Sequence, residues 1–230
     1  MTFKRPDNRK LDELRKIEAK AGVIKRADGS AYFKIGDTIA YAAVYGPRDL
    51  YPKFLQDPGQ GTLRCSYNMM PFSGSGERVR PGGSRRSKEI SMVTKNALLP
   101  VLDLREFPNA VVDVFIEFPQ TDAGSRCAGI CAASIALADA GIVMKDLVSA
   151  VAVGYVKGNV IVDLSKEEED IEDAADIPMA IIPYNEKISL LQMDGILPKA
   201  ELKKAIEMGK HACKKINEIQ KKALKDKYKI

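Results

Sequence analysis

The chain passes from a strand to a helix in the stretch Val111-Val-Asp-Val-Phe-Ile-Glu-Phe-Pro-Gln-Thr-Asp-Ala-Gly-Ser-Arg-Cys127. The apolar run 111–118 predicts a strand, and the small apolar residues that follow predict a buried helix. The first N–H groups of a helix have no partner within the helix and carry partial positive charge, so they attract anions. Ser125 adds a hydroxyl group and Arg126 adds a planar charged donor. We therefore expect a phosphate site at Gly124, Ser125 and Arg126, although a helix capped by serine explains the turn alone equally well.

Strand and helix patterns alternate on both sides of this stretch. Apolar runs and turn residues predict strands at 23–26, 30–35, 38–45, 61–69, 110–118, 147–156, 159–164, 177–183 and 187–193. Helical spacing predicts helices at 8–20, 87–99, 125–140 and 198–225. The Gly-rich segment 73–83 predicts a mobile loop. Since neither a linker nor a short repeat interrupts the pattern, we expect one α+β domain over residues 1–230, with two β-rich halves and packed helices.

The positive charge of the chain is unevenly distributed. The formal net charge is +5, but residues 199–229 hold eleven lysines and four acids and so carry +7 themselves. A Lys-rich helix face is usually only solvated. Six of the twelve arginines lie between residues 44 and 89. Because arginine binds phosphate with two donors, this clustering indicates a surface for a polyanion.

Several classes of protein and of site are disfavoured. The first ten residues lack the apolar segment of a signal peptide, and the apolar stretch 127–144 is interrupted by Asp139, so we expect a cytoplasmic chain without a membrane partner. The four cysteines predict core packing rather than disulfides or zinc. The single histidine, His211, lies in a Lys-rich helical pattern and predicts a helix-surface residue rather than a catalytic base.

Two further groups of residues can carry chemistry. Arg85 and Arg86 begin a predicted helix, where a cation pair opposes the helix dipole unless an anion binds there, although two solvated arginines explain the pair equally well. Arg64 and Tyr67 lie three apart on a predicted strand and could clamp RNA by phosphate contact and base stacking, although core packing explains Tyr67 equally well.

The acidic stretch Glu167-Glu-Glu-Asp-Ile-Glu-Asp-Ala-Ala-Asp176 has two interpretations. Its composition favours a solvated loop. Asp170 follows one predicted strand, however, and Asp176 immediately precedes another. Carboxylates held in this way near a basic site can act as general acids or hold a divalent cation.

Together these motifs resemble the RNase PH family of phosphate-dependent 3′→5′ exoribonucleases, and most closely its branch of catalytic ring subunits of archaeal exosomes. The segments that carry the resemblance are 42–48, 64–73, 84–90, 120–126, 133–141, 151–154, 169–170 and 175–178. The resemblance implies an RNase PH-like fold, of the ribosomal protein S5 domain 2-like type. It also implies a hexameric ring, a trimer of heterodimers with a non-catalytic RNase PH-like subunit, and RNA-binding cap subunits.

The reaction implied is phosphorolysis, in which inorganic phosphate as co-substrate releases nucleoside diphosphates from the 3′ end of single-stranded RNA, or adds a tail in reverse. By resemblance, the inorganic phosphate would bind Gly124, Ser125 and Arg126. RNA would bind Arg64, Tyr67, Arg85 and Arg86. Asp170 would be the general acid, and Asp176 would position it or hold Mg²⁺ with it.

Three other functions stay open at this point. The chain could be a non-catalytic RNase PH-like ring subunit, although such a subunit has no physical need for the carboxylates and the phosphate turn. It could be a bacterial-type RNase PH that acts as a homo-oligomer. It could also be a metal-dependent hydrolytic nuclease, which would release monophosphates and ignore phosphate.

Overall fold

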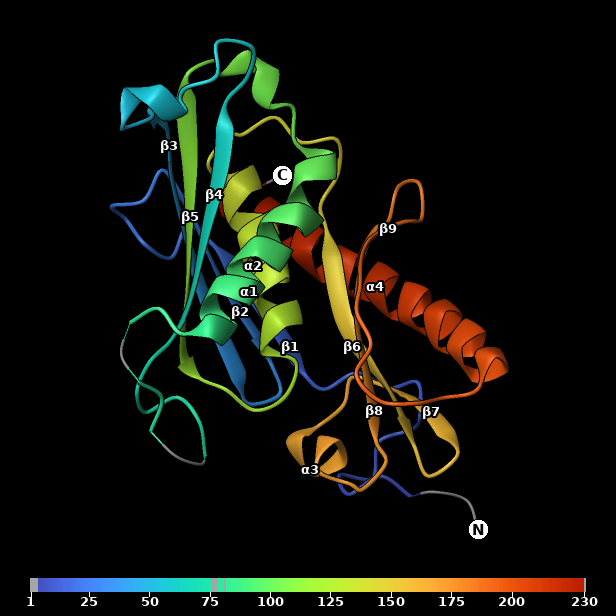
Figure 1. Cartoon of the computed structure of the whole chain (residues 1–230). Coiled ribbons are helices and arrows are strands. Elements are labelled where there is room, and N and C mark those ends of the chain that lie inside the picture. Colours follow the sequence, from blue (N-terminus) through green and yellow to red (C-terminus); the bar gives the residue numbers. More distant parts are fainter. Residues whose placement is uncertain (1–3, 76–77, 81, 230) are drawn as a thin grey trace.

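Two β-sheets with helices packed against them form the molecule (Figure 1), in a computed structural model that describes residues 4–75, 78–80 and 82–229. The first sheet has the order β1-β2-β3-β5-β4 and consists of β1 (Ile17–Ala21), β2 (Gly29–Ile35), β3 (Thr38–Asp49), β4 (Thr62–Met69) and β5 (Ala110–Gln120). The second has the order β7-β6-β8-β9 and consists of β6 (Ser149–Val156), β7 (Asn159–Val162), β8 (Ala175–Ile182) and β9 (Lys187–Leu191). The helices are α1 (Arg85–Leu98), α2 (Ser125–Asp139), α3 (Lys166–Glu169) and α4 (Lys199–Tyr228), with 3₁₀ turns at Lys53–Leu55, Leu99–Val101 and Leu104–Glu106.

Helix α2 joins the two sheets. It packs against β2 and β3 of the first sheet and β6 of the second, and almost all of its residues are buried. Its small residues permit this closeness: a Cβ atom added at Gly129 would lie 3.2 Å from the ring of Phe118. One hydrophobic cluster therefore runs from Phe33 and Val114 in the first sheet to Val151 and Ile177 in the second. The predicted α+β fold is confirmed.

The pairing of β4 with β5 positions two helix N-termini side by side. These two strands are parallel, with Met69 opposite Phe118. Since parallel strands end at the same edge of a sheet, the chain leaves both strands at that edge. The connection after β4 leads to the first turn of α1, and the connection after β5 leads to the first turn of α2. The two arginine-bearing helix starts are thus brought together by strand topology.

The prediction of a helix at 8–20 is wrong, because long-range ion pairs hold this segment in turns. Arg15 donates to both carboxylate oxygens of Asp163, at 2.7 and 3.0 Å, and Arg9 donates to the Asp163 carbonyl at 3.1 Å. The chain then enters β1. The predicted strand 23–26 is also absent, since this segment forms a loop and turn.

The acidic stretch, predicted as a loop, contains the one-turn helix α3. Of the Gly-rich segment 73–83, residues 76, 77 and 81 lie outside the described residues. Among the helices of the described chain, none combines the length and apolar character that a membrane span requires.

Candidate active site

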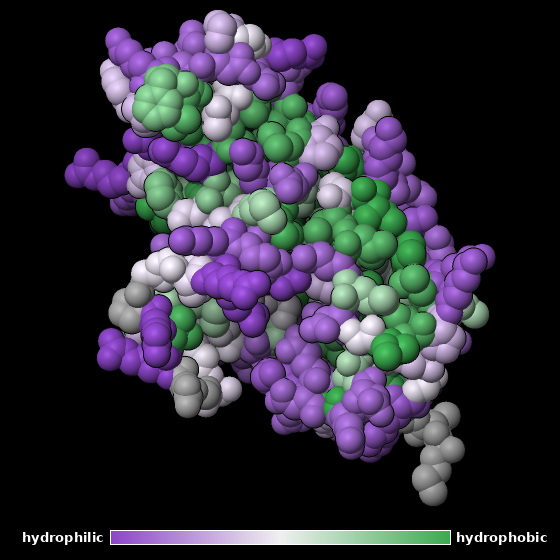
Figure 2. Space-filling model, in the orientation of Figure 1, coloured by the Kyte–Doolittle hydropathy of each residue, from purple (hydrophilic) through white to green (hydrophobic). Residues whose placement is uncertain are grey.

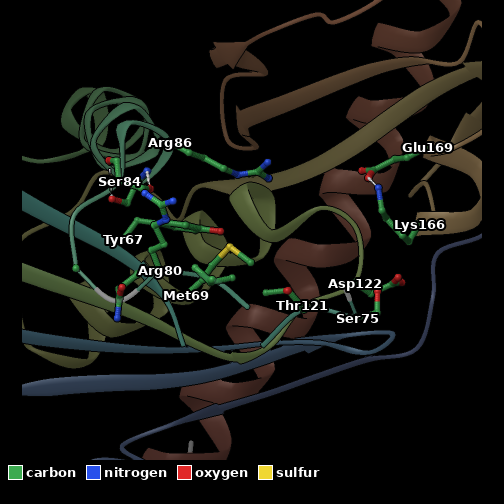
Figure 3. A pocket seen from close by; sticks show the side chains of 15 residues that line it. Tyr67, Met69, Ser75, Arg80, Ser84, Arg86, Thr121, Asp122, Lys166 and Glu169 are labelled. Carbon is green, nitrogen blue, oxygen red and sulfur yellow. Dashed lines mark hydrogen bonds and ion pairs between the residues drawn. The ribbon is translucent and has the colours of Figure 1, made fainter. Parts of the chain in front are cut away.

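Three cavities, with volumes of about 360, 300 and 60 Å³, open beside the first turns of α1 and α2. Arg86 of α1 and Glu169 of α3 line all three. Figure 3 shows these two side chains reaching toward the largest cavity from opposite sides. We call the three cavities together the cleft. The cleft therefore lies between the first sheet with its helix starts and the acidic segment that precedes β8.

The smallest cavity surrounds the predicted phosphate turn. Gly124, Ser125 and Arg126 all line it. Gly124 is the N-cap residue of α2, has a φ of 71°, and receives no cap from a described side chain. Ser125 does not act as a cap but accepts a hydrogen bond of 2.8 Å from the hydroxyl of Tyr67. The interpretation as a serine-capped helix is therefore wrong, and the first N–H groups of α2 remain available to an anion.

Arg126 is held in place by two polar side chains. Its Nη1 atom donates to Oε1 of Gln192 at 2.5 Å, and its Nη2 atom lies 3.8 Å from Oε2 of Glu89. The amide of Gln192 donates in turn to Glu89 at 3.1 Å. These contacts join α1, α2 and the segment after β9. They restrict the guanidinium group, so that less freedom is lost when it binds an anion.

Asp176 lies in β8 and faces the cleft. Its backbone exchanges hydrogen bonds of 2.8 and 2.9 Å with that of Asp194, while its Oδ1 atom is buried without a hydrogen-bond partner in the described chain. Burial, followed by the charge of Glu169, raises the pKa of Asp176 to about 6. A carboxyl group with a pKa near neutrality can exchange protons during a reaction.

The structure does not bring Asp170 into the cleft. Its side chain is 63% exposed and accepts a hydrogen bond of 2.7 Å from Lys166, and it lines none of the three cavities as the described residues define them. The side chain of Glu169 is 24% exposed and faces Asp176 instead. Sequence reasoning missed Glu169, because adjacent acidic residues carry no signal of which one faces inward.

The four residues predicted to bind RNA differ in position. All three arginines are exposed, but only Arg86 lines the cleft, and Arg64 and Arg85 line none of its cavities as described. Arg64 donates to both oxygens of Asp113, at 2.5 and 2.8 Å. Tyr67 is 3% exposed with its ring 4.9 Å from that of Phe118, and it lines the 360 Å³ cavity while its hydroxyl donates to Ser125.

The residues proposed for Mg²⁺ do not fit a metal site. Asp170 and Asp176 line no common cavity, and within the described chain no group of three or more His, Cys, Asp or Glu side chains is arranged to hold a metal. Cys127, Cys131 and Cys213 are buried, as predicted, and His211 lies on an exposed face of α4.

Comparison with known proteins agrees with this arrangement. Residues 13–143 match domain 1 of the 3′ exoribonuclease family, RNase PH, and residues 146–212 match domain 2. The exosome complex component Rrp41 of Nitrosopumilus maritimus is 52% identical over 98% of this chain and 91% of its own length. The same component of Thermococcus kodakarensis is 52% identical over 98% of this chain and 90% of its own length.

Solved structures share the fold over almost the entire chain. Rice Rrp46 superposes with a TM-score of 0.85 and 26% identity, covering 96% of this chain and all of that protein. A chain of the Archaeoglobus fulgidus exosome with RNA bound to the active site gives a TM-score of 0.80 at 24% identity, covering 94% of this chain and 92% of its own. With both family domains matched in order and relatives 52% identical over nearly the whole chain, the chain belongs to the RNase PH family of 3′ exoribonucleases.

Proposed function

We propose that the chain degrades single-stranded RNA from its 3′ end by phosphorolysis, as the catalytic subunit of an archaeal exosome ring. The observation that carries this proposal is the 60 Å³ cavity, where the start of α2, two arginines and Asp176 meet. The similarity to Rrp41 exosome components over nearly the whole chain supports it further.

The groups around this cavity suit the attack of one anion on another. The N–H groups of α2, with Ser125 and Arg126, would bind inorganic phosphate, which is the attacking group. Arg86 would bind the phosphate of the RNA and neutralise the charge that builds up as the bond changes. Arg64 and Arg85 would contact RNA outside the cleft, and Tyr67 would hold Ser125 in place. Mg²⁺ enters no step here, because the described carboxylates do not form a site for it.

The ring partner would dock beside β9. This strand is the edge of the second sheet, and its backbone can pair with another chain. Figure 2 shows apolar surface over the same region. Large apolar residues are exposed on β9 and the segments that flank it: Tyr184, Ile188, Leu191, Met193 and Ile196. Such a patch supports docking of a non-catalytic RNase PH-like subunit. The proposal includes a hexameric ring with RNA-binding caps, which the family resemblance implies.

Two further properties belong to the same proposal. The shared hydrophobic core supports a single domain over residues 1–230, although the family description counts two. The four free cysteines support a cytoplasmic location, where thiols stay reduced.

The test is to identify the released nucleotide. The chain is assembled with the second RNase PH-like subunit of its own organism and given single-stranded RNA with and without inorganic phosphate. We expect nucleoside diphosphates, and only when phosphate is present. Monophosphates released without phosphate would indicate a hydrolytic nuclease, and inactivity of the ring would indicate a structural subunit. Activity of the chain alone would favour the homo-oligomeric type.

A further inference from the structure

We propose that Arg15 and Thr38 are positioning residues that hold the segment 122–124, which leads into α2, in the shape that binds inorganic phosphate. This inference rests on the proposed phosphorolytic function. Neither side chain lines the cleft as the described residues define it. Both therefore act on phosphate binding through the backbone that they hold, and not by touching the phosphate.

Arg15 ties the segment 122–124 to the second half of the molecule. Its Nη1 atom donates to Oδ2 of Asp122 at 2.8 Å, and its Nη2 atom donates to the carbonyl oxygen of Ala123 at 3.2 Å. Its Nη2 and Nε atoms also donate to the two carboxylate oxygens of Asp163, just after β7, at 2.7 and 3.0 Å. The Arg15 side chain is only 8% exposed. Since the guanidinium group is planar and rigid, it fixes the segment relative to Asp163.

Thr38 holds the same segment from the start of β3. Its hydroxyl donates to the carbonyl oxygen of Ala123 at 2.8 Å and accepts from the backbone N–H of Asp122 at 3.0 Å, and the residue is completely buried. A trans peptide unit is planar, with its C=O and N–H groups pointing in opposite directions. Because Arg15 and Thr38 both donate to the Ala123 carbonyl, the N–H of Gly124 points away from them. Gly124 lines the 60 Å³ cavity, and its N–H donates to no acceptor in the described chain.

Arg15 also neutralises a carboxylate beside the anion site. Asp122 lines both the 360 and the 60 Å³ cavities, and the smaller one surrounds the phosphate turn. Without its partner, this carboxylate would repel an incoming phosphate ion.

Loss of either positioning residue should weaken phosphate binding more than the chemical step. A segment released from these contacts adopts other conformations as well, and the apparent affinity for a ligand falls with the fraction of molecules in the binding conformation. Molecules that have bound both substrates have the segment in place, so their turnover should change little.

The experiment measures release of nucleoside diphosphate by the assembled ring, with phosphate varied at saturating single-stranded RNA. Arg15→Gln and Thr38→Val should each raise the apparent KM for phosphate by about tenfold or more, while kcat stays within about threefold of the wild type. A role in folding alone would lower the amount of active ring without changing this KM.

Each variant has a matched control elsewhere in the structure. Arg9 donates to the carbonyl oxygen of Asp163 at 3.1 Å and to its carboxylate at 3.3 Å, but none of its hydrogen bonds in the described chain reaches the segment 122–124. Thr94 is completely buried, and its hydroxyl has no hydrogen-bond partner in the described chain. Arg9→Gln and Thr94→Val should both leave the KM for phosphate within about threefold of the wild type.

The inference is overturned if Arg9→Gln raises the KM for phosphate as much as Arg15→Gln does, or if Arg15→Gln and Thr38→Val lower kcat and leave that KM unchanged. Thermal unfolding identifies any variant that fails to fold. If Arg15→Gln is such a variant, the comparison of Thr38→Val with Thr94→Val decides alone. A wild-type ring that releases no nucleoside diphosphate contradicts the proposed function itself, whereas an active wild type with unaffected variants contradicts only the positioning role.

Discussion

Replacing Asp176 by Asn should stabilise the protein while abolishing phosphorolysis. Burial raises the pKa of Asp176 from an ordinary 3.8 to about 6, so the folded state resists its ionisation. The difference of about 2 pKa units corresponds to about 3 kcal/mol of folding free energy at a pH where the carboxylate is charged. Because the amide must still find hydrogen bonds in the cleft, we expect a gain of about 1–3 kcal/mol.

The stabilisation by Asp176→Asn depends on pH. A carboxyl group whose pKa is raised by folding lowers stability as the pH rises from 3.8 through about 6. Asn cannot ionise and avoids that loss. The gain in folding stability of Asp176→Asn over the wild type should thus be full at pH 8, shrink below pH 6, and vanish near pH 4.

Thermal unfolding measured across this pH range provides the assay. For a chain of this length, 1–3 kcal/mol corresponds to an increase in Tm of about 3–10 °C. Asp170→Asn is the matched control and should leave Tm unchanged, since its side chain is 63% exposed. A variant Asp176→Asn that is less stable than the wild type at pH 8, or whose advantage is the same at pH 4, would refute the reasoning.

Three further predictions concern the phosphate turn and the anchor of α3. Arg126→Lys should raise the KM for phosphate by about tenfold or more, because lysine lacks the planar two-donor group; an unchanged phosphate dependence of diphosphate release would contradict this. Gly124→Ala should lower the free energy of unfolding in denaturant by about 1–2 kcal/mol, the cost of a left-handed backbone. Gly83→Ala is the control and should have little effect, because Gly83 is exposed and an added Cβ would make only an ordinary contact with Lys88; equal losses would remove the backbone explanation. Arg5→Ala should cost about 3–5 kcal/mol, since the buried Glu168 loses both hydrogen bonds from Arg5 and keeps only the Ser165 N–H and the more distant Arg9 at 3.9 Å. The double variant Arg5→Ala with Glu168→Gln should recover part of that loss, and strictly additive losses would show that the pair is not coupled.

The strands and helices that the sequence predicted correctly are apolar segments, and apolar segments are buried in almost any compact fold. The apolar runs 38–45 and 110–118 and the small-residue helix 125–140 were confirmed as β3, β5 and α2. The helix at 8–20 failed although Leu11, Leu14 and Ile17 have helical spacing. Arginines in that segment pair with Asp163, about 150 residues further along the chain. No local pattern reveals such a contact.

The residues of the candidate site were likewise predicted only in part. Gly124, Ser125, Arg126, Arg86 and Asp176 came together at one cleft, since each lies at the end of a strand or the start of a helix. Asp170, Arg64 and Arg85 did not join them. Tyr67 was found in the core that supports the site. For surface segments of uniform charge, the chemistry of the side chains can be predicted but their direction cannot.

The sequence by itself determined the family, the strand-to-helix turn at 124–126 and the kinds of side chain available to the chain, because these depend on which residues occur and on their order. Only the tertiary structure decided which acid lines the cleft. Glu169 and Asp170 are neighbours with the same charge, and the directions of successive helical residues differ by about 100° around the axis. The orientation of α3 depends on Arg5 of the N-terminal segment, which lies 163 residues from Glu168 in the sequence and contacts it only in the folded chain.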